Sequence, residues 1–261
     1  MKKELLSILC VIFSVTIKGQ QVDSIPLIDL HIHLKGDLTL EEAVLKSEHD
    51  GVQYGIAANC GLGFPVQNDA QIDSFINILS KYPQFYKGMQ AEGREWIKLF
   101  SEKSIKKFDY VFTDAMTFVD EKGRRNRIWI EEETWIENEE DFMDYYVKVI
   151  VGILNNEPVD IYVNPTYLPA QLYDRYDYFW SEGRMDKVIS AAKNNNIAIE
   201  INNRFKIPSA RFIRKAKKAG VRFTIGTNNI DKNFSRPEYA LEIIRKCGLT
   251  RNDFFIPDKR E

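Results

Sequence analysis

The regular alternation of short apolar runs with longer helical patterns most constrains how this chain folds. Runs rich in Val, Ile, Tyr and Phe predict seven strands, at residues 25–34, 52–59, 86–92, 108–116, 160–164, 197–202 and 222–228. Each run is followed by a pattern typical of a helix, at residues 40–48, 70–81, 95–105, 139–154, 183–193, 209–219 and 237–246. This alternation predicts parallel strands that are covered by helices.

Seven strand–helix units in one domain favour a closed barrel over an open nucleotide-binding sheet. The first predicted helix is not opened by a G-x-G-x-x-G sequence, which is the main signature of the open sheet. We therefore predict an α/β fold, a TIM-like (β/α)7 barrel, over residues 21–261. Residues 117–138 interrupt the alternation after the fourth strand, and such insertions fall on the face where barrel active sites lie. The insertion is either a lid over the site or a solvated hairpin.

Residues 1–20 have the three parts of a secretory signal peptide. The start is basic at Lys2 and Lys3, and residues 5–17 form an apolar run that ends in polar sequence. This run is shorter than the roughly 20 apolar residues of a membrane span. We expect cleavage near residue 20, a periplasmic or secreted mature protein and no stable membrane insertion. An uncleaved anchor is the alternative.

Charge and cysteine content argue against nucleic acid as a partner and against a disulfide framework. The 261 residues carry a net charge of -2, so the chain lacks the basic field that binds nucleic acid by neutralising phosphates. A chain of this length can bury a full core without disulfides. Cys60 and Cys247 would remain after signal cleavage, and we expect two free buried thiols rather than a disulfide.

The sequence Asp29-Leu30-His31-Ile32-His33 ends the first predicted strand. Residues two apart in an extended chain face the same side, so Asp29, His31 and His33 are predicted to face the barrel interior. Two imidazoles and a carboxylate at this spacing can hold a divalent metal such as Zn, Mn or Fe. The third histidine, His49, ends the first predicted helix, where interaction with the helix dipole favours a structural role.

Other charged residues stand at or near predicted strand ends. Glu200 lies on an otherwise apolar strand, and a buried charge requires a partner. It is therefore either a general base or the ion-pair partner of a cation such as Arg204. Cations that follow strand ends could hold a phosphate or carboxylate of a small-molecule substrate. The candidates of this kind are Lys35, Arg94, Arg204 and Lys232.

The motif at residues 29–33 resembles the opening motif of the PHP (polymerase and histidinol phosphatase) family of metal-dependent hydrolases. Residues 199–203 and 219–226 are similar to the late part of the same family. PHP proteins are distorted barrels of seven βα units, so the resemblance implies the fold that the alternation predicts. It also implies that Glu92 matches the bridging glutamate after the third strand. Asp114 stands where the family has a histidine after the fourth.

The chain departs from the family pattern at other ligand positions. The T-D-H-like motif after the second strand is replaced by Ala57-Ala58-Asn59-Cys60, and the histidine before proline after the fifth strand is Asn164. Asn228 lies in the segment that replaces the family's G-S-D-A-H-like motif. An Asn amide is a weak metal ligand and carries no charge that offsets a cation.

The resemblance with these replacements implies one metal site instead of a cluster. Its candidate ligands are Asp29, His31, His33 and Glu92, and its candidate catalytic bases are Asp114 and Glu200. The candidate substrate-binding residues are Lys35, Arg94, Asn164, Arg204 and Asn228.

We therefore predict a secreted metal-dependent hydrolase in which one metal activates water against a phosphoester or an amide. The alternative, motivated by the Asn replacements, is a catalytically inactive PHP-like barrel that binds a ligand. Adenosine-deaminase-like enzymes are similar at His31–Leu34, but they require a late histidine and none follows His49.

Overall fold

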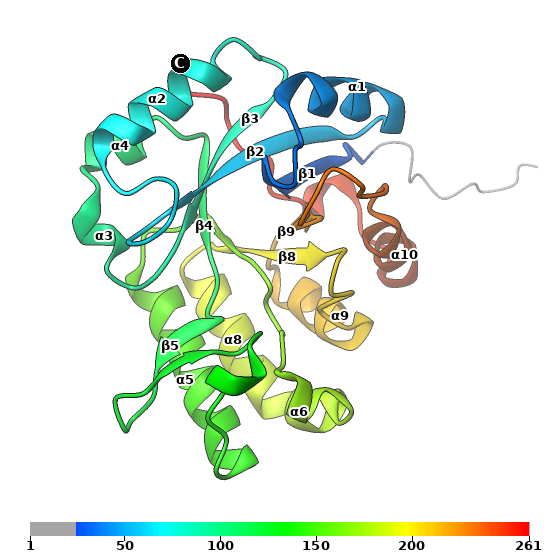
Figure 1. Cartoon of the computed structure of the whole chain (residues 1–261). Helices are drawn as coiled ribbons and strands as arrows, with labels where there is room; N and C mark the ends of the chain where they lie inside the picture. Colours follow the sequence, from blue (N-terminus) through cyan, green and yellow to red (C-terminus); the bar gives the residue numbers. More distant parts are fainter. Residues whose placement is uncertain (1–24, 261) are drawn as a thin grey trace, which may run out of the picture.

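The computed structural model describes residues 25–260 (Figure 1). The predicted signal peptide, residues 1–20, lies outside this range. Among the described helices, none combines the length and the apolar character that a membrane span requires. Both cysteines of the described range, buried Cys60 and partly buried Cys247, are free.

Seven parallel strands close into a barrel in the order β1-β2-β3-β4-β7-β8-β9. Pairing of β1 with both β2 and β9 closes the ring, since Asp29 lies opposite Tyr54 on one side and Ile225 on the other. The predicted seven-unit barrel is therefore confirmed. The strands are β1 (Ile28–Ile32), β2 (Gln53–Cys60), β3 (Tyr86–Ala91), β4 (Tyr110–Thr113), β7 (Ile161–Tyr162), β8 (Ala198–Asn202) and β9 (Phe223–Gly226).

Helices surround the barrel, as Figure 1 shows. They are α1 (Leu40–Asp50), α2 (Asp69–Leu79), α3 (Trp96–Leu99), α4 (Glu102–Ile105), α5 (Glu139–Asn156), α6 (Ala170–Tyr173), α7 (Tyr176–Phe179), α8 (Glu182–Asn194), α9 (Ala210–Ala219) and α10 (Glu238–Cys247). The single helix expected at residues 95–105 is split into α3 and α4. The break occurs because Phe100 is extended and Ser101 caps a new helix, its side chain accepting a hydrogen bond from Ser104 N.

The insertion at residues 117–138 begins with a small antiparallel hairpin formed by β5 (Thr117–Val119) and β6 (Arg125–Arg127). Phe118 on β5 packs against Phe142 and Tyr146 of α5, which fixes the hairpin to the outside of the barrel (Figure 1). The chain then returns through Trp129, a half-exposed side chain at the mouth of the barrel. The insertion therefore combines a packed hairpin with one contribution to the site.

The barrel interior is polar at one end and apolar at the other. The apolar interior cluster includes Tyr86, Phe112 and Ile161, and Phe255 and Ile256 from the C-terminal segment pack against it. Phe255 N donates a hydrogen bond to the carbonyl oxygen of β9 residue Phe223 at 2.9 Å. The C-terminal segment thus covers the end at which the strands begin, and polar side chains gather where they end.

Candidate functional site

His31 and His33 are buried at the end of β1, with ring centroids 5.1 Å apart. In each ring Nδ1 has a partner. His31 Nδ1 lies 2.6 Å from Glu200 Oε1, and His33 Nδ1 lies 3.0 Å from the carbonyl oxygen of Ala57. The Nε2 atoms of both rings are buried and have no hydrogen-bond partner within residues 25–260. The two histidines are thus held in place and each leaves one ring nitrogen available to a ligand.

The hydrogen bonds determine which nitrogen carries the proton. A carbonyl oxygen can only accept, so Nδ1 of His33 donates to Ala57 and Nε2 keeps its lone pair in the neutral ring. Burial, and then the charge of His31, lower the pKa of His33 well below its usual range. An Nδ1–H held by a carbonyl or carboxylate, with Nε2 free, is the usual arrangement of metal-binding histidines.

Glu200 is a positioning group for His31. It is buried on β8, and its second oxygen, Oε2, accepts hydrogen bonds from Asn164 N at 2.8 Å and Asn202 Nδ2 at 2.9 Å. On the neighbouring strand β9, Gly226 leaves room for the Glu200 carboxylate, because a Cβ at residue 226 would overlap it. The partner of Glu200 is therefore His31, and both of its oxygens are engaged within the protein.

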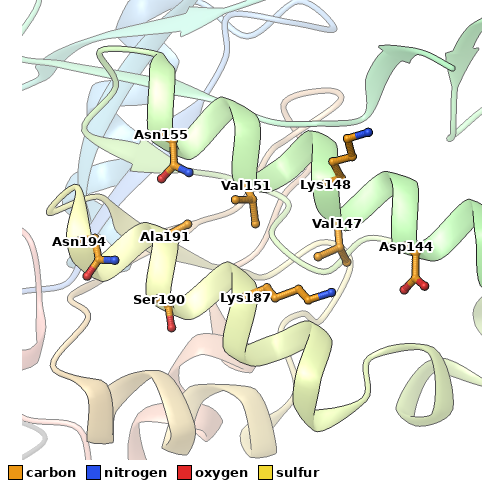
Figure 2. Close-up of a pocket in the computed structure, with 9 residues that line it drawn as sticks. All are labelled: Asp144, Val147, Lys148, Val151, Asn155, Lys187, Ser190, Ala191 and Asn194. Carbon is orange, nitrogen blue, oxygen red and sulfur yellow. The ribbon is translucent and has the colours of Figure 1, made fainter. Parts of the chain in front are cut away.

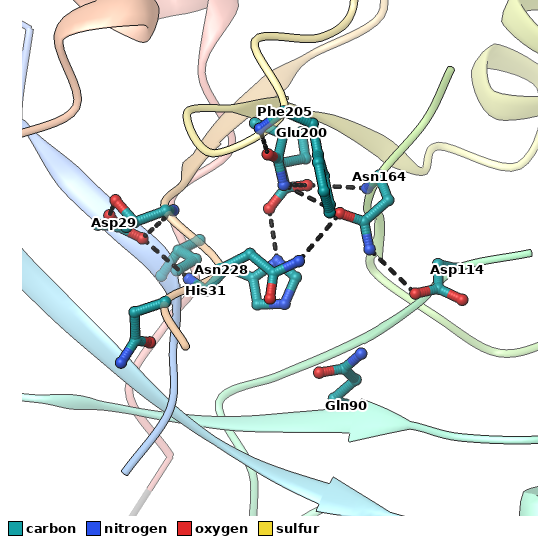
Figure 3. Close-up of polar contacts among 12 residues, drawn as sticks. Asp29, His31, Gln90, Asp114, Asn164, Glu200, Phe205 and Asn228 are labelled. Carbon is teal, nitrogen blue, oxygen red and sulfur yellow. Dashed lines mark hydrogen bonds and ion pairs between the residues drawn. The ribbon is translucent and has the colours of Figure 1, made fainter. Parts of the chain in front are cut away.

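Neutral amides connect this carboxylate to Asp114 (Figure 3). The Asn164 side chain donates to Asp114 Oδ2 at 3.0 Å and accepts from Asn202 and Asn228 at 3.0 and 3.2 Å. The other oxygen of Asp114 accepts from Met116 N at 2.9 Å. Asn residues therefore bond to one another and to Asp114 in the region where the family resemblance implies charged ligands.

The third strand brings an amide, Gln90, next to His33, whereas Glu92 lies past the end of β3. Asn59 at the end of β2 bridges the two residues, donating to Gln90 Oε1 at 2.9 Å and to Glu92 Oε1 at 2.7 Å. Burial, and secondly the charge of Asp114, raise the pKa of Glu92 to about 8. The raised pKa favours the protonated form of Glu92, which is suited to donate a proton.

Asp29 does not join the two histidines. The pairing of β1 with β2 advances three residues on β1, from Asp29 to Ile32, against two on β2, so a β-bulge interrupts the alternation. The carboxylate instead accepts hydrogen bonds from His31 N and from the backbone and hydroxyl of Thr227. Burial raises the pKa of Asp29 to about 6. Figure 3 shows its carboxylate on the far side of the strand from the His31 ring.

The donor atoms limit which metal centre these residues fit. Within residues 25–260 no three side chains of His, Cys, Asp or Glu converge as a metal site, so the predicted four-ligand set is not assembled. The unpartnered Nε2 atoms of His31 and His33 fit two nitrogen ligands of one ion. They do not fit a cluster of two or three metals, which requires more anionic ligands.

A hollow of about 440 Å³ opens at this end of the barrel, and we call it the mouth hollow. Its lining is Lys35, Asn59, Phe64, Pro65, Gln90, Glu92, Asp114, Met116, Trp129, Asn164, Tyr167, Arg204, Phe205 and Asn228. Four predicted substrate-binding residues are among them, and Arg94 is not. Arg94 instead pairs with Glu157 at 2.8 Å and donates to Thr113, and Lys232 pairs with Glu42 on the surface.

The sequence did not single out Asn59, Gln90 or the aromatic residues that line the mouth hollow. Asn59 ends a predicted strand and was available as a signal, because polar residues at strand ends face the active-site end of a barrel. Trp129, Tyr167 and Phe205 lie in connecting segments, where no periodic pattern indicates which side chains turn inward.

Two further hollows lie outside the barrel interior. The side hollow, about 450 Å³, is lined by Thr166, Tyr167, Leu168, Ala170, Tyr173, Asp174, Tyr176, Arg204, Phe205 and Ile207. A hollow of about 550 Å³ lies between α5 and α8, where Val147, Val151 and Ala191 form its apolar floor (Figure 2). This last hollow contains none of the predicted site residues, whereas the mouth hollow contains several of them.

Comparison with known proteins supports the fold. No protein-family model and no curated protein matches the sequence. Among solved structures, the chain is similar to histidinol phosphate phosphatase from Lactococcus lactis subsp. lactis, complexed with zinc, L-histidinol and phosphate. The TM-score is 0.62 at 14% identity, over 87% of this chain and 95% of that one. At this identity the likeness shows the fold, which agrees with the PHP-type barrel predicted from the sequence.

Two other likenesses are too weak to carry an argument. An archaeal ribonuclease P structure with mature tRNA matches at a TM-score of 0.41 and 16% identity, over 85% of this chain and 88% of that chain. A putative mandelate racemase/muconate lactonizing enzyme from Roseovarius nubinhibens matches at a TM-score of 0.36 and 8% identity. That match covers 78% of this chain and 55% of that chain.

Proposed function

We propose that this protein is a hydrolase of the PHP barrel type in which His31 and His33 hold one divalent metal beside the mouth hollow. The observation that carries the proposal is the pair of buried Nε2 atoms that have no partner in the described part of the chain. A buried polar atom left unpaired costs about 1–3 kcal/mol. Two such atoms side by side, each with Nδ1 already oriented, are explained by a ligand that binds both nitrogens.

A metal bound there would lower the pKa of a coordinated water and supply a nucleophile. The protein's own residues would hold the metal ligands and supply a proton. Glu200 and the Ala57 carbonyl hold the two rings, and protonated Glu92 faces the mouth hollow as the group that can protonate a leaving atom. The substrate is a small molecule, cleaved at a phosphoester or an amide. The zinc and phosphate in the similar histidinol phosphate phosphatase structure support this class.

On the sequence of residues 1–20 we also propose that the protein is exported and works in the periplasm or outside the cell.

A second candidate is a barrel that binds a ligand without turning it over. The amides of Asn164, Asn202 and Asn228 favour it, because their mutual hydrogen bonds occupy groups that would otherwise contact a metal or a reacting atom.

Turnover distinguishes the two candidates. The mature protein is stripped with a chelator, reloaded with zinc, manganese or iron(II), and assayed with p-nitrophenyl phosphate and an amino-acid p-nitroanilide. The hydrolase predicts metal-dependent release of p-nitrophenol or p-nitroaniline that falls about 100-fold or more in His31→Gln/His33→Gln. His49→Gln is the matched control, since the His49 side chain is 86% exposed on α1. Metal-loaded protein without turnover of either substrate class favours the binding protein.

A further inference from the structure

The mouth hollow and the side hollow share one wall, formed by Tyr167, Arg204 and Phe205. Tyr167 lies in the segment after β7, and the other two lie in the segment after β8. The Tyr167 and Phe205 rings meet edge to face with centroids 4.8 Å apart, and the Arg204 guanidinium lies 4.8 Å from the centre of the Phe205 ring. One cation and two rings thus face both hollows.

Two cations and two carboxyl groups line the mouth hollow, and the cations are Lys35 and Arg204. Both cations are substantially exposed, and Lys35 is attracted by the charge of Glu92 and repelled by that of Arg204. Neither forms an ion pair within residues 25–260. The Asp114 carboxylate accepts from Asn164 and from Met116 N instead. Glu92 likewise accepts from Asn59 at 2.7 Å. Two exposed cations that form no ion pair with these hydrogen-bonded carboxyl groups favour an anionic group between them.

The side hollow differs in character from the mouth hollow. Tyr173 and Tyr176 line it together with the shared rings, and Leu168 and Ile207 add aliphatic surface. Aromatic side chains around a concave surface favour a flat apolar group, because rings stack or meet edge to face with it. Arg204 contributes an additional flat face, since a guanidinium stacked on an aromatic ring keeps its N–H groups free for an anion.

We propose that the two hollows form one elongated site for an organic anion with a planar apolar body. The carboxylate or phosphate lies between Lys35 and Arg204. The planar group extends along the shared residues into the side hollow. This inference rests on the proposed function only in using the same mouth hollow, because binding of the anion requires neither the metal nor turnover.

The test measures binding by isothermal titration to metal-free protein, repeated with zinc added. The probes are 2-naphthoate, 2-naphthyl phosphate, neutral 2-naphthylmethanol, acetate and inorganic phosphate. The proposal expects each naphthyl anion to bind about tenfold or more tightly than the neutral alcohol and than the corresponding small anion. The ratio between the two naphthyl anions identifies carboxylate or phosphate as the preferred group.

Two variants localise the binding. Arg204→Met should weaken the naphthyl anions about tenfold, whereas Arg236→Met, a matched change at another exposed arginine, should leave them unchanged. Tyr173→Ala should weaken the naphthyl anions and leave inorganic phosphate unaffected. Equal binding of the neutral alcohol, or equal effects of the two arginine variants, would overturn the proposal. Since 2-naphthoate is not hydrolysed, these outcomes do not depend on the proposed activity.

Discussion

At the scale of single residues, Glu200 links His31 to the asparagines of the site. Its carboxylate accepts one hydrogen bond from His31 and two from Asn164 and Asn202, and no oxygen of it is left for a substrate. This is the position of a carboxylate that orients a metal ligand. Glu200 therefore acts through His31 and is a positioning residue, and the catalytic proton carrier we propose is Glu92.

Glu200→Gln tests that assignment. The amide –NH2 would face donors where the carboxylate now accepts, so the free energy of unfolding should fall by about 1–3 kcal/mol. Zinc affinity should fall about 10- to 100-fold, because the His31 ring loses its orienting charge. The control is Glu157→Gln, whose carboxylate accepts from Arg94 and Trp96 away from the histidines. It should lose stability and keep zinc affinity, and unchanged zinc affinity in Glu200→Gln would contradict the assignment.

Residue chemistry was partly predictable from the sequence. His31 and His33 stand out because two histidines at period two end a strand, and Glu200 because it is the one charge on an apolar strand. Its partner was not predictable, since the contact with His31 joins residues 169 apart. Asp29 followed the same period-two rule and does not join the histidines, because a one-residue bulge lies between it and Ile32.

At the scale of elements, packing inside the barrel depends on Tyr110. Its side chain reaches across from β4 and its hydroxyl donates to the Leu30 carbonyl oxygen on β1 at 2.7 Å. The intervening strands carry glycine where the ring passes, Gly55 on β2 and Gly88 on β3, and a Cβ at either would overlap the Tyr110 hydroxyl. Small residues on two strands thus make room for one large residue on a third.

Gly88→Ala should therefore lower the free energy of unfolding by about 1–3 kcal/mol, as overpacking does in a filled interior. Tyr110→Phe removes the atom nearest to the new Cβ. The double variant should therefore lose less free energy of unfolding than the sum of the two single losses, by about 0.5 kcal/mol or more. Denaturant unfolding of the two single variants and the double variant measures this coupling. Gly152→Ala on α5, where nothing lies within 4 Å, is the control and should be neutral or stabilising. If the two losses of free energy simply add, contact with Tyr110 is not what restricts the size of the side chain at residue 88.

The strands and long helices were predictable because each has its own periodic pattern and flanking signals. Thr39 and Glu42 form a capping box at the start of α1, and Gly220 ends α9 in the left-handed region. The break between α3 and α4 carries no such clear signal, because Ser101 is a moderate helix former and a good cap. Which loop side chains line the mouth hollow depends on tertiary contacts.

At the scale of the whole molecule, one end of the barrel is apolar and covered, and the other end is polar. Apolar side chains and the C-terminal segment fill the end where the strands begin. Histidines, carboxylates, amides and two unpaired cations line the other. A zinc-bound phosphatase has a similar fold, and the metal site that we propose here is reduced to two histidines.

The central claim, that the two free Nε2 atoms hold one metal, is tested most directly by zinc stoichiometry. Wild type, His31→Gln/His33→Gln and His49→Gln are dialysed against buffered zinc, and bound zinc is measured by mass spectrometry. The account predicts about one tightly held zinc per chain in wild type and in His49→Gln, and none in the double variant. A wild-type protein that retains no zinc, manganese or iron(II), or a double variant that binds as much as wild type, would contradict it.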